Sequence, residues 1–82
     1  MVVATVARGG VLPQSVNFTG PVVFVFGSEG AGLGRDWHEA ASVEVTIPMA
    51  PGIESLNVGA AAAILLFERV RQLSGVAAKT RA

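Results

Sequence analysis

Cysteine is absent from this sequence of 82 residues, and histidine occurs only once. Without cysteine the chain has no disulfide framework and no thiolate metal site. The single His38 does not find enough ligands around it for a zinc site, which usually needs four. We therefore expect no metal in this protein.

Net charge is also lacking, because six basic residues balance six acidic ones and the formal charge is zero. A chain that binds nucleic acid by itself usually shows an excess of positive charge, so no strong footprint of that kind is expected here. The longest uncharged helical stretch is far shorter than the ~20 apolar residues that span a bilayer. The N-terminus has no signal-peptide pattern. These absences favour a cytoplasmic protein that does not enter a membrane.

Hydrophobic residues, in contrast, make up 51% of the chain. This is well above what disordered proteins contain, and the length suits one small domain. A chain this short buries a smaller fraction of its surface than a larger domain does. We therefore expect some apolar surface to face a partner or a segment outside this sequence.

Three stretches predict β-strands. Val2 to Val6 (V-V-A-T-V) is rich in β-formers, and Val22 to Phe26 (V-V-F-V-F) is apolar at every position. The second strand is therefore expected to be covered on both faces, as in a parallel sheet. Val43 to Ile47 (V-E-V-T-I) alternates and should lie nearer the sheet edge. Between the first two, Val11 to Pro21 reads as a loop with one irregular turn.

A glycine-rich stretch follows the second strand. Gly27 to Gly34 reads G-S-E-G-A-G-L-G, with four glycines in eight residues, which indicates a sharp turn or a close approach of another group. The spacing matches neither the G-x-G-x-x-G dinucleotide pattern nor a phosphate-binding P-loop. Asp36 and Glu39 then resemble a capping box and predict a short helix that ends near Ala41.

A long helix is predicted to begin at Ser55, Leu56 or Asn57. Serine and asparagine are good N-caps, and the free N–H groups behind them attract anionic or electron-rich ligand atoms. Val58 to Phe67 has no charged residue, so this part of the helix is expected to be buried on all sides. Gly75 fits a C-cap that ends the helix.

Strands and helices in this order predict an α/β fold with parallel strands. Short crossovers then place Gly27 and the Ile47-Pro48-Met49 turn at the carboxyl ends of neighbouring strands. Ligands bind at that edge in open α/β sheets. The residues alone therefore predict a small α/β domain with a backbone-lined ligand site at the strand ends.

Two motifs together resemble the SpoU family, the TrmH-like RNA 2′-O-ribose methyltransferases of the SPOUT class. Val22 to Gly34 is similar to the family's second motif, a strand followed by G-S-E-G and a later G-L. Ile47 to Gln72 is similar to the third motif, with I-P-M, S-L-N-V, an alanine-rich helix and F-E-x-x-R-Q. Val2 to Leu12 looks like the strand and turn before the second motif. The motifs occur in order and cover most of the chain.

The resemblance implies the C-terminal half of a trefoil-knot domain, in which the C-terminal segment is threaded through a loop. It also implies that S-adenosylmethionine binds in the knot, with Gly27, Ile47 and Leu56 at the family's cofactor-contact positions. The family is dimeric, with the closing helix in the interface. The small residues from Gly59 to Ala63 suit such close packing.

Glu29, Ser55, Asn57 and Arg71 match the family's polar positions around the catalytic centre, where the resemblance gives them supporting roles. Each also has a structural interpretation. Glu29 can cap a glycine turn, Ser55 or Asn57 can be plain helix caps, and Arg71 can pair with Glu68 three residues earlier.

One feature of the family is missing from this sequence. The first motif, N-x-G-x-x-x-R, carries the arginine held to activate the ribose hydroxyl, and no such pattern occurs between residues 1 and 82. We therefore interpret the chain as a single SpoU-type domain that is incomplete at its N-terminus. The implied function is ribose 2′-O-methylation of tRNA or rRNA, of which this part binds the cofactor. The alternative is a non-catalytic module that binds S-adenosylmethionine or only dimerises.

Overall fold

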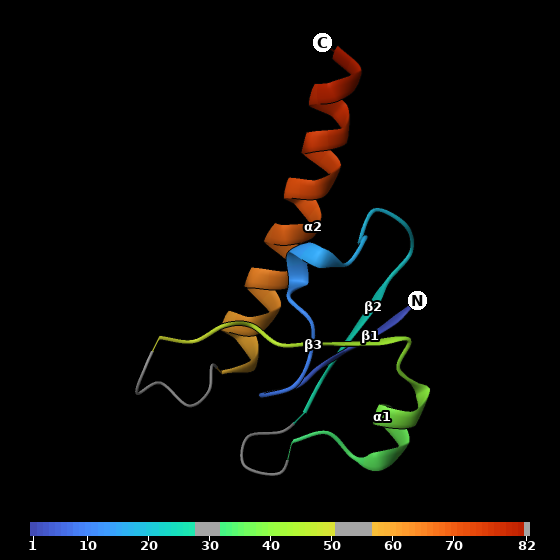
Figure 1. The fold of residues 1–82 in the computed structure, drawn as a ribbon, viewed down its shortest axis with the longest axis vertical. Coiled ribbons are helices and arrows are strands. Elements are labelled where there is room, and N and C mark those ends of the chain that lie inside the picture. Colours follow the sequence, from blue (N-terminus) through green and yellow to red (C-terminus); the bar gives the residue numbers. More distant parts are fainter. Residues whose placement is uncertain (28–31, 51–56, 82) are drawn as a thin grey trace.

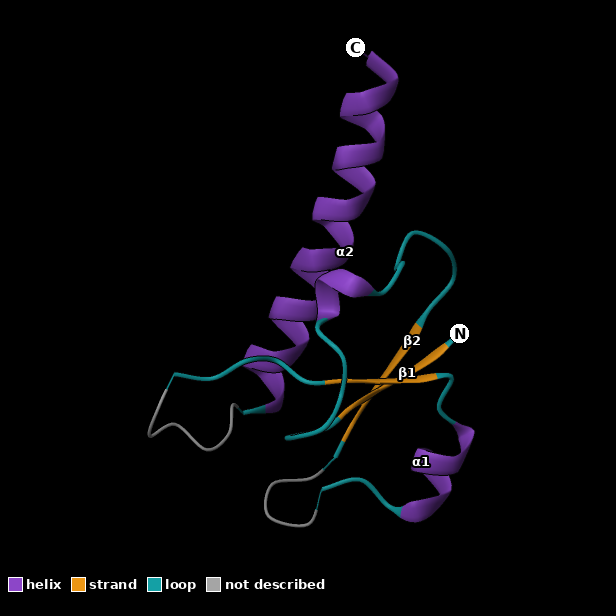
Figure 2. Ribbon diagram, viewed as in Figure 1, coloured by secondary structure: helices purple, strands orange, loops and turns teal. Residues whose placement is uncertain are grey.

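The computed structural model describes residues 1–27, 32–50 and 57–81, and their elements alternate between strand and helix (Figure 1). The chain is α/β, as predicted. A 3-10 turn lies in the first connection, where the sequence predicted one irregular turn, and a long helix closes the chain (Figure 2). In order, the elements are β1 (Val2–Thr5), η1 (Pro13–Ser15), β2 (Val23–Phe26), α1 (Arg35–Ala40), β3 (Val43–Val45) and α2 (Val58–Arg81).

The strands form one parallel sheet in the order β2-β1-β3. In this register Thr5, at the end of β1, pairs with Phe26 on one side and Val45 on the other. The parallel arrangement and the outer position of β3 confirm the sequence prediction. The predicted neighbours were wrong in one respect. β1 lies between the strands that lead to Gly27 and Ile47, because the first strand of the chain takes the centre of the sheet.

Backbone from the connection between β1 and β2 lies on both edges of β3. On one edge the N–H of Val6 donates to the carbonyl of Val45 at 2.9 Å. On the other edge the N–H of Val11 donates to Glu44 at 2.9 Å, and Thr46 donates to Val11 at 3.0 Å. The connection after β1 therefore contacts both edges of β3. The chain that continues beyond β3 runs between Val6 and Val11. The trefoil knot that the resemblance implied stays a prediction.

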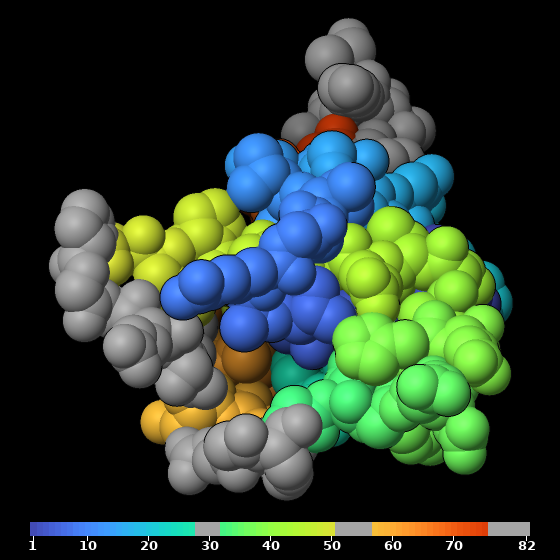
Figure 3. Space-filling view, turned by 60° about the horizontal axis from the view of Figure 1, so that its bottom comes forward, coloured from blue at the N-terminus to red at the C-terminus, as the bar shows by residue number. Residues whose placement is uncertain are grey.

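Gly10 permits the close crossing. A side-chain carbon at this position would lie 2.6 Å from the carbonyl carbon of Val45, which is too short for any residue other than glycine. The N–H of Gly10 donates to the hydroxyl of Thr46 at 2.8 Å. Figure 3 shows this blue segment crossing the front of the molecule against the yellow-green chain of β3 and beyond.

The core lies on the face of the sheet that α2 covers. Val3, Phe18, Val45 and Leu65 are fully buried there and form one cluster. The ring of Phe18 meets Phe24 edge to face, with centroids 5.1 Å apart. Burying side chains of this size stabilises the fold by roughly 1.5–3 kcal/mol each. The core thus joins all three strands, the first connection and α2.

The opposite face of the sheet belongs to α1. Successive strand residues point to opposite faces, so Glu44 faces away from the side on which Val45 is buried. Glu44 pairs there with His38 of α1. The two helices therefore cover different faces of the sheet.

Two burial predictions were wrong. β2 was expected to be covered on both faces, but it is an outer strand of this sheet and Val23 is 58% exposed. The apolar run of α2 was expected to be buried all round, but only Ala61 and Leu65 are buried. Leu66, at 55%, and Phe67, at 68%, face outward, because the sheet covers only one side of the helix.

Two helix boundaries also differ from the prediction. Asp36 does not cap α1. Gly34 is the N-cap, and Asp36 lies in the first turn, where a carboxylate favours the positive end of the helix dipole. Gly75 does not end α2, which continues to Arg81, because one glycine inside a helix costs only about 1 kcal/mol. In the described part of the chain, neither helix combines the length and apolar character needed to cross a membrane.

Candidate cofactor site at the strand ends

The carboxyl ends of the three strands meet at one edge of the sheet. Thr5 ends β1, Gly27 follows β2, and Ile47 lies two residues beyond β3. Neighbouring strands are about 4.8 Å apart, so the two outer chains flank a span of ~10 Å with Thr5 in the middle. This edge brings together the two predicted cofactor-contact positions that the structure describes.

Gly27 lies against backbone that returns from the glycine-rich stretch. A side-chain carbon on Gly27 would overlap Gly32 and would lie 2.5 Å from the backbone nitrogen of Leu33. Gly32 itself has a φ of 69°, a conformation that favours glycine. Two of the glycines are thus explained by the way the stretch folds back onto the end of β2.

Ile47 is held firmly where the chain leaves β3. Its side chain is half-buried and packs against the core cluster. The preceding residue, Thr46, is bound through its N–H to Val11 and through its hydroxyl to Gly10. The backbone just before Ile47 is therefore held by Gly10 and Val11, as a backbone-lined site requires.

Thr5 was not singled out from the sequence. Its hydroxyl oxygen is buried and has no hydrogen-bond partner among the described residues. A buried polar group without a partner costs on the order of 1–3 kcal/mol, so the position suits contact with a polar ligand atom. The available signal was the one polar side chain in the V-V-A-T-V strand.

Asn57 caps the N-terminus of α2. Its side-chain oxygen accepts a hydrogen bond from the N–H of Ala60 at 2.7 Å, and its backbone carbonyl accepts one from Ala61 at 3.0 Å. This is the cap interpretation that the sequence offered for Asn57. The side chain is exposed, so the cap does not remove it from contact with a ligand.

Arg71 lies far from Asn57 within one chain. About four helical turns, or ~21 Å along the axis of α2, separate them. The guanidinium donates to both oxygens of Glu68, from Nε at 2.9 Å and from the NH2 group at 2.7 Å. These bonds lower the pKa of Glu68 and raise the pKa of Arg71. Arg71 thus makes the pairing that the structural interpretation predicted, and the chain does not bring it to the strand-end edge.

Glu29, Ser55 and Leu56 lie outside the described residues. A hollow of about 480 Å³ is found away from the strand ends, between the loop around η1 and α2. It is lined by Gln14, Ser15, Val16, Asn17, Thr19, Arg71, Gln72 and Gly75. In the described ranges, no three potential metal-ligating side chains gather.

Sequence comparison matches residues 1–67 to the SpoU rRNA Methylase family. A 23S rRNA (guanosine-2′-O-)-methyltransferase RlmB from Ralstonia nicotianae is 49% identical over 63 residues, which are 77% of this chain and 25% of the relative. An uncharacterized tRNA/rRNA methyltransferase from Synechocystis is 40% identical over 70 residues, or 85% of this chain and 26% of the relative. The chain therefore spans about a quarter of the length of these curated relatives.

Solved structures give the same result. The SpoU methyltransferase AviRb from Streptomyces viridochromogenes, in complex with AdoMet, has a TM-score of 0.84 at 36% identity and matches 90% of this chain and 29% of its own. The TrmH/SpoU tRNA modifying enzyme of A. aeolicus has a TM-score of 0.82 at 35% identity, covering 93% of this chain and 39% of its own. At this identity the likeness extends beyond the fold to the family.

Proposed function

The chain belongs to the SpoU rRNA Methylase family, and on that premise we propose that it is the cofactor-binding part of an RNA ribose 2′-O-methyltransferase. The name of the Ralstonia relative supports a 2′-O-methylation of guanosine in rRNA, and the A. aeolicus relative extends the substrate class to tRNA. S-adenosylmethionine is the proposed cofactor, as in the AviRb complex.

The buried hydroxyl of Thr5 is the observation that carries this proposal. It lies at the centre of the sheet edge, between the chains that lead to Gly27 and Ile47, and has no partner among the described residues. S-adenosylmethionine, an elongated molecule with several polar groups, fits this edge of the sheet. Gly27, Ile47 and Leu56 would hold its adenosine part. The bound cofactor supplies an electrophilic methyl group.

The chain's own polar residues would position the acceptor. Glu29, Ser55 and Asn57 are proposed to orient the ribose at the start of α2, where the exposed Asn57 side chain already faces outward. Holding the ribose hydroxyl in the reactive orientation lowers the barrier to methyl transfer. The ribose hydroxyl must also lose its proton, and this sequence has no N-x-G-x-x-x-R pattern to provide the family's arginine.

We also propose that the chain forms a homodimer through α2 and works in the cytoplasm. The outward side of α2 carries Leu66, Phe67 and Val70, all more than half exposed. Apolar side chains in one contiguous stripe favour a protein partner, and closed two-fold dimers are the commonest symmetric assemblies. A cytoplasmic location agrees with an RNA substrate.

Calorimetric titration with S-adenosylmethionine tests the proposed cofactor site. Thr5→Val has nearly the same shape but no hydroxyl, and we expect it to weaken binding about tenfold while the fold remains intact. Thr5→Ser keeps the hydroxyl and should bind within about threefold of the parent chain. A well-folded parent chain that shows no binding at millimolar ligand would refute the site.

A methyl-transfer assay separates this proposal from a non-catalytic module. The readout is tritium transfer from S-adenosylmethionine to bulk tRNA and rRNA, followed by analysis for 2′-O-methylated nucleosides. The chain alone is expected to bind the cofactor without appreciable transfer. Fusion to an N-terminal half that carries the first motif should produce transfer, whereas a module that only binds or dimerises would stay inactive.

A further inference from the structure

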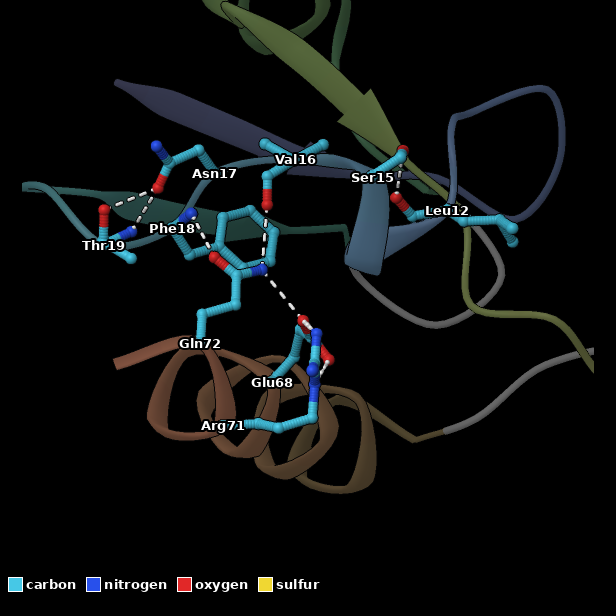
Figure 4. A network of polar contacts seen from close by, with 9 residues as sticks. All are labelled: Leu12, Ser15, Val16, Asn17, Phe18, Thr19, Glu68, Arg71 and Gln72. Atoms are coloured by element: carbon cyan, nitrogen blue, oxygen red, sulfur yellow. Dashed lines mark hydrogen bonds and ion pairs between the residues drawn. The ribbon is translucent and has the colours of Figure 1, made fainter. Parts of the chain in front are cut away.

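Gln72 joins α2 to the first connection through both ends of its side-chain amide. Its nitrogen donates to the carbonyl of Val16 at 2.8 Å, and its oxygen accepts from the N–H of Phe18 at 2.7 Å (Figure 4). One side chain thus satisfies two backbone groups more than 50 residues away in sequence. A neighbouring strand would offer the same donor and acceptor.

Two further side chains on α2 fix the orientation of this amide. The nitrogen of Gln72 also donates to Glu68 at 2.8 Å, and Glu68 is held in turn by the two hydrogen bonds from Arg71 (Figure 4). Because a carboxylate only accepts hydrogen bonds, the amide nitrogen must face Glu68. The amide oxygen is then directed at Phe18. We call Gln72, Glu68 and Arg71 the clasp.

The backbone that the clasp holds is the returning part of the loop around β3. The connection pairs with the outer edge of β3 at Val11 and next passes η1. It then reaches Val16 and Phe18, where Phe18 enters the core. The clasp therefore fastens α2, which follows β3 in the chain, to the connection whose backbone lies on both edges of β3.

We propose that Gln72 is a positioning residue that keeps this loop closed around β3 and so fixes the backbone at the strand-end site. The link runs from Phe18 back to Val11, which binds Thr46 next to Ile47. Arg71 takes part from the outer turn of α2, by holding Glu68, rather than by contact with a ligand at the strand ends. The inference concerns the geometry of the free chain and does not depend on which cofactor binds.

Amide exchange measured by NMR on the full chain tests the clasp. In Gln72→Leu the N–H of Phe18 loses its acceptor, and we expect its protection factor to fall about tenfold or more. The amide resonances of Thr46 and Ile47 should shift at the same time, which a role confined to the Gln72 contact would not cause. Ala40→Glu is a control, because Ala40 is exposed on α1 and lies away from the clasp. It should leave both measurements unchanged.

Gln72→Glu provides a rescue experiment in the same position. At pH 7 its carboxylate cannot donate to Val16 and is repelled by Glu68. At pH 4 a protonated carboxyl regains one donor. The charged side chains described at the clasp are Glu68 and Arg71, and the facing residues 14–19 are uncharged. We expect Phe18 protection in this variant to be lower at pH 7 and to recover at pH 4, whereas Ala40→Glu should show no such recovery.

Each outcome for the Gln72 variants either supports or overturns the proposal. A folded Gln72→Leu variant in which either the Phe18 protection or the Thr46 and Ile47 resonances stay unchanged would overturn the proposal. If Gln72→Leu does not fold, the pH series of Gln72→Glu decides. Recovery on acidification supports the clasp, and equal protection at both pH values overturns it.

Discussion

The side-chain oxygen of Asn57 receives the N–H of Ala60, three residues into α2, at 2.7 Å. This bond satisfies one of the free donors at the start of the helix. Replacing Asn57 with alanine should therefore lower the free energy of unfolding by about 1 kcal/mol. Urea denaturation followed by circular dichroism measures the change.

Asn57→Ser separates the cap from the proposed role at the ribose. Serine caps helices about as well as asparagine, so the stability should stay within roughly 0.5 kcal/mol of the parent chain. In the fused, active enzyme the same variant should still lose methyl-transfer rate if the amide contacts the acceptor. Full activity in Asn57→Ser would mean that Asn57 acts only as a helix N-cap.

Stability should depend on the ionisation of Glu68. Hydrogen bonding from Arg71 is the main cause that holds the pKa of Glu68 below its ordinary value of 4.5, and Gln72 adds to it. The folded chain therefore binds the proton less readily than the unfolded chain. The stabilisation is complete above about pH 4.5 and is lost as the pH falls through the lower, folded-state pKa.

Urea midpoints between pH 3 and pH 7 test this dependence. In Glu68→Gln the urea midpoint should be lower at neutral pH. It should also fall less between pH 4.5 and pH 3, the part of the curve called the acid limb below. Glu39→Gln is the matched control, since it removes an exposed carboxylate from α1 and should retain the limb. An unchanged acid limb in Glu68→Gln would mean that other carboxylates govern acid unfolding.

Gly27 should tolerate no side chain. In Gly27→Ala the new carbon collides with the backbone of Gly32 and Leu33, and overpacking of this kind costs about 1–3 kcal/mol. Binding of S-adenosylmethionine should fall with it, because the end of β2 shifts. Gly20→Ala is the control: a carbon there meets nothing within 4 Å, and both measurements should be unaffected. Thermal denaturation and calorimetry report the two effects.

The exposed side of α2 should mediate self-association. Phe67→Asp places a charge where a 68%-exposed ring now lies, and we expect the dimer to weaken at least tenfold, since burial of such a ring contributes about 1.5–3 kcal/mol. Sedimentation at micromolar concentration checks this. Ala61→Glu would be a poor test, because Ala61 is only 6% exposed within its own subunit and the charge would disrupt the core. Trp37→Asp, on α1, is the control for replacing an exposed aromatic residue. A monomeric parent chain would contradict the proposed dimer.

The sequence predicted the elements well, because strand and helix periodicity are local properties. V-V-A-T-V and V-V-F-V-F formed adjacent parallel strands, and the long helix begins directly after Asn57. Periodicity cannot say which strand takes the centre of a sheet. The central place of β1, and with it the buried hydroxyl of Thr5, depends on pairing between residues far apart in the chain.

Burial was the property that the sequence predicted least well. An apolar run indicates that a surface will be covered but not whether the same chain covers it, as Leu66 and Phe67 show. Motif matching placed Arg71 with the catalytic residues, which stays a prediction. Its separation from Asn57 within one chain depends on the straight course of α2, which a motif does not encode. The sequence indicated Gln72 only as the last residue of the F-E-x-x-R-Q motif. Its hydrogen-bond partners, Val16 and Phe18, are distant in sequence, so the motif could not predict them.

The position of β3 between Val6 and Val11 also bears on how the molecule responds to mechanical force. A pull along the chain from the C-terminal side of β3 loads hydrogen bonds on both of its edges at once, from Val45 to Val6 and from Thr46 to Val11. Bonds loaded in parallel share the load, whereas the bonds of a hairpin open one after another. An unfolding motor that grips this end must therefore break both rows together, so extraction of β3 from this end should be slower than the opening of a hairpin of the same length.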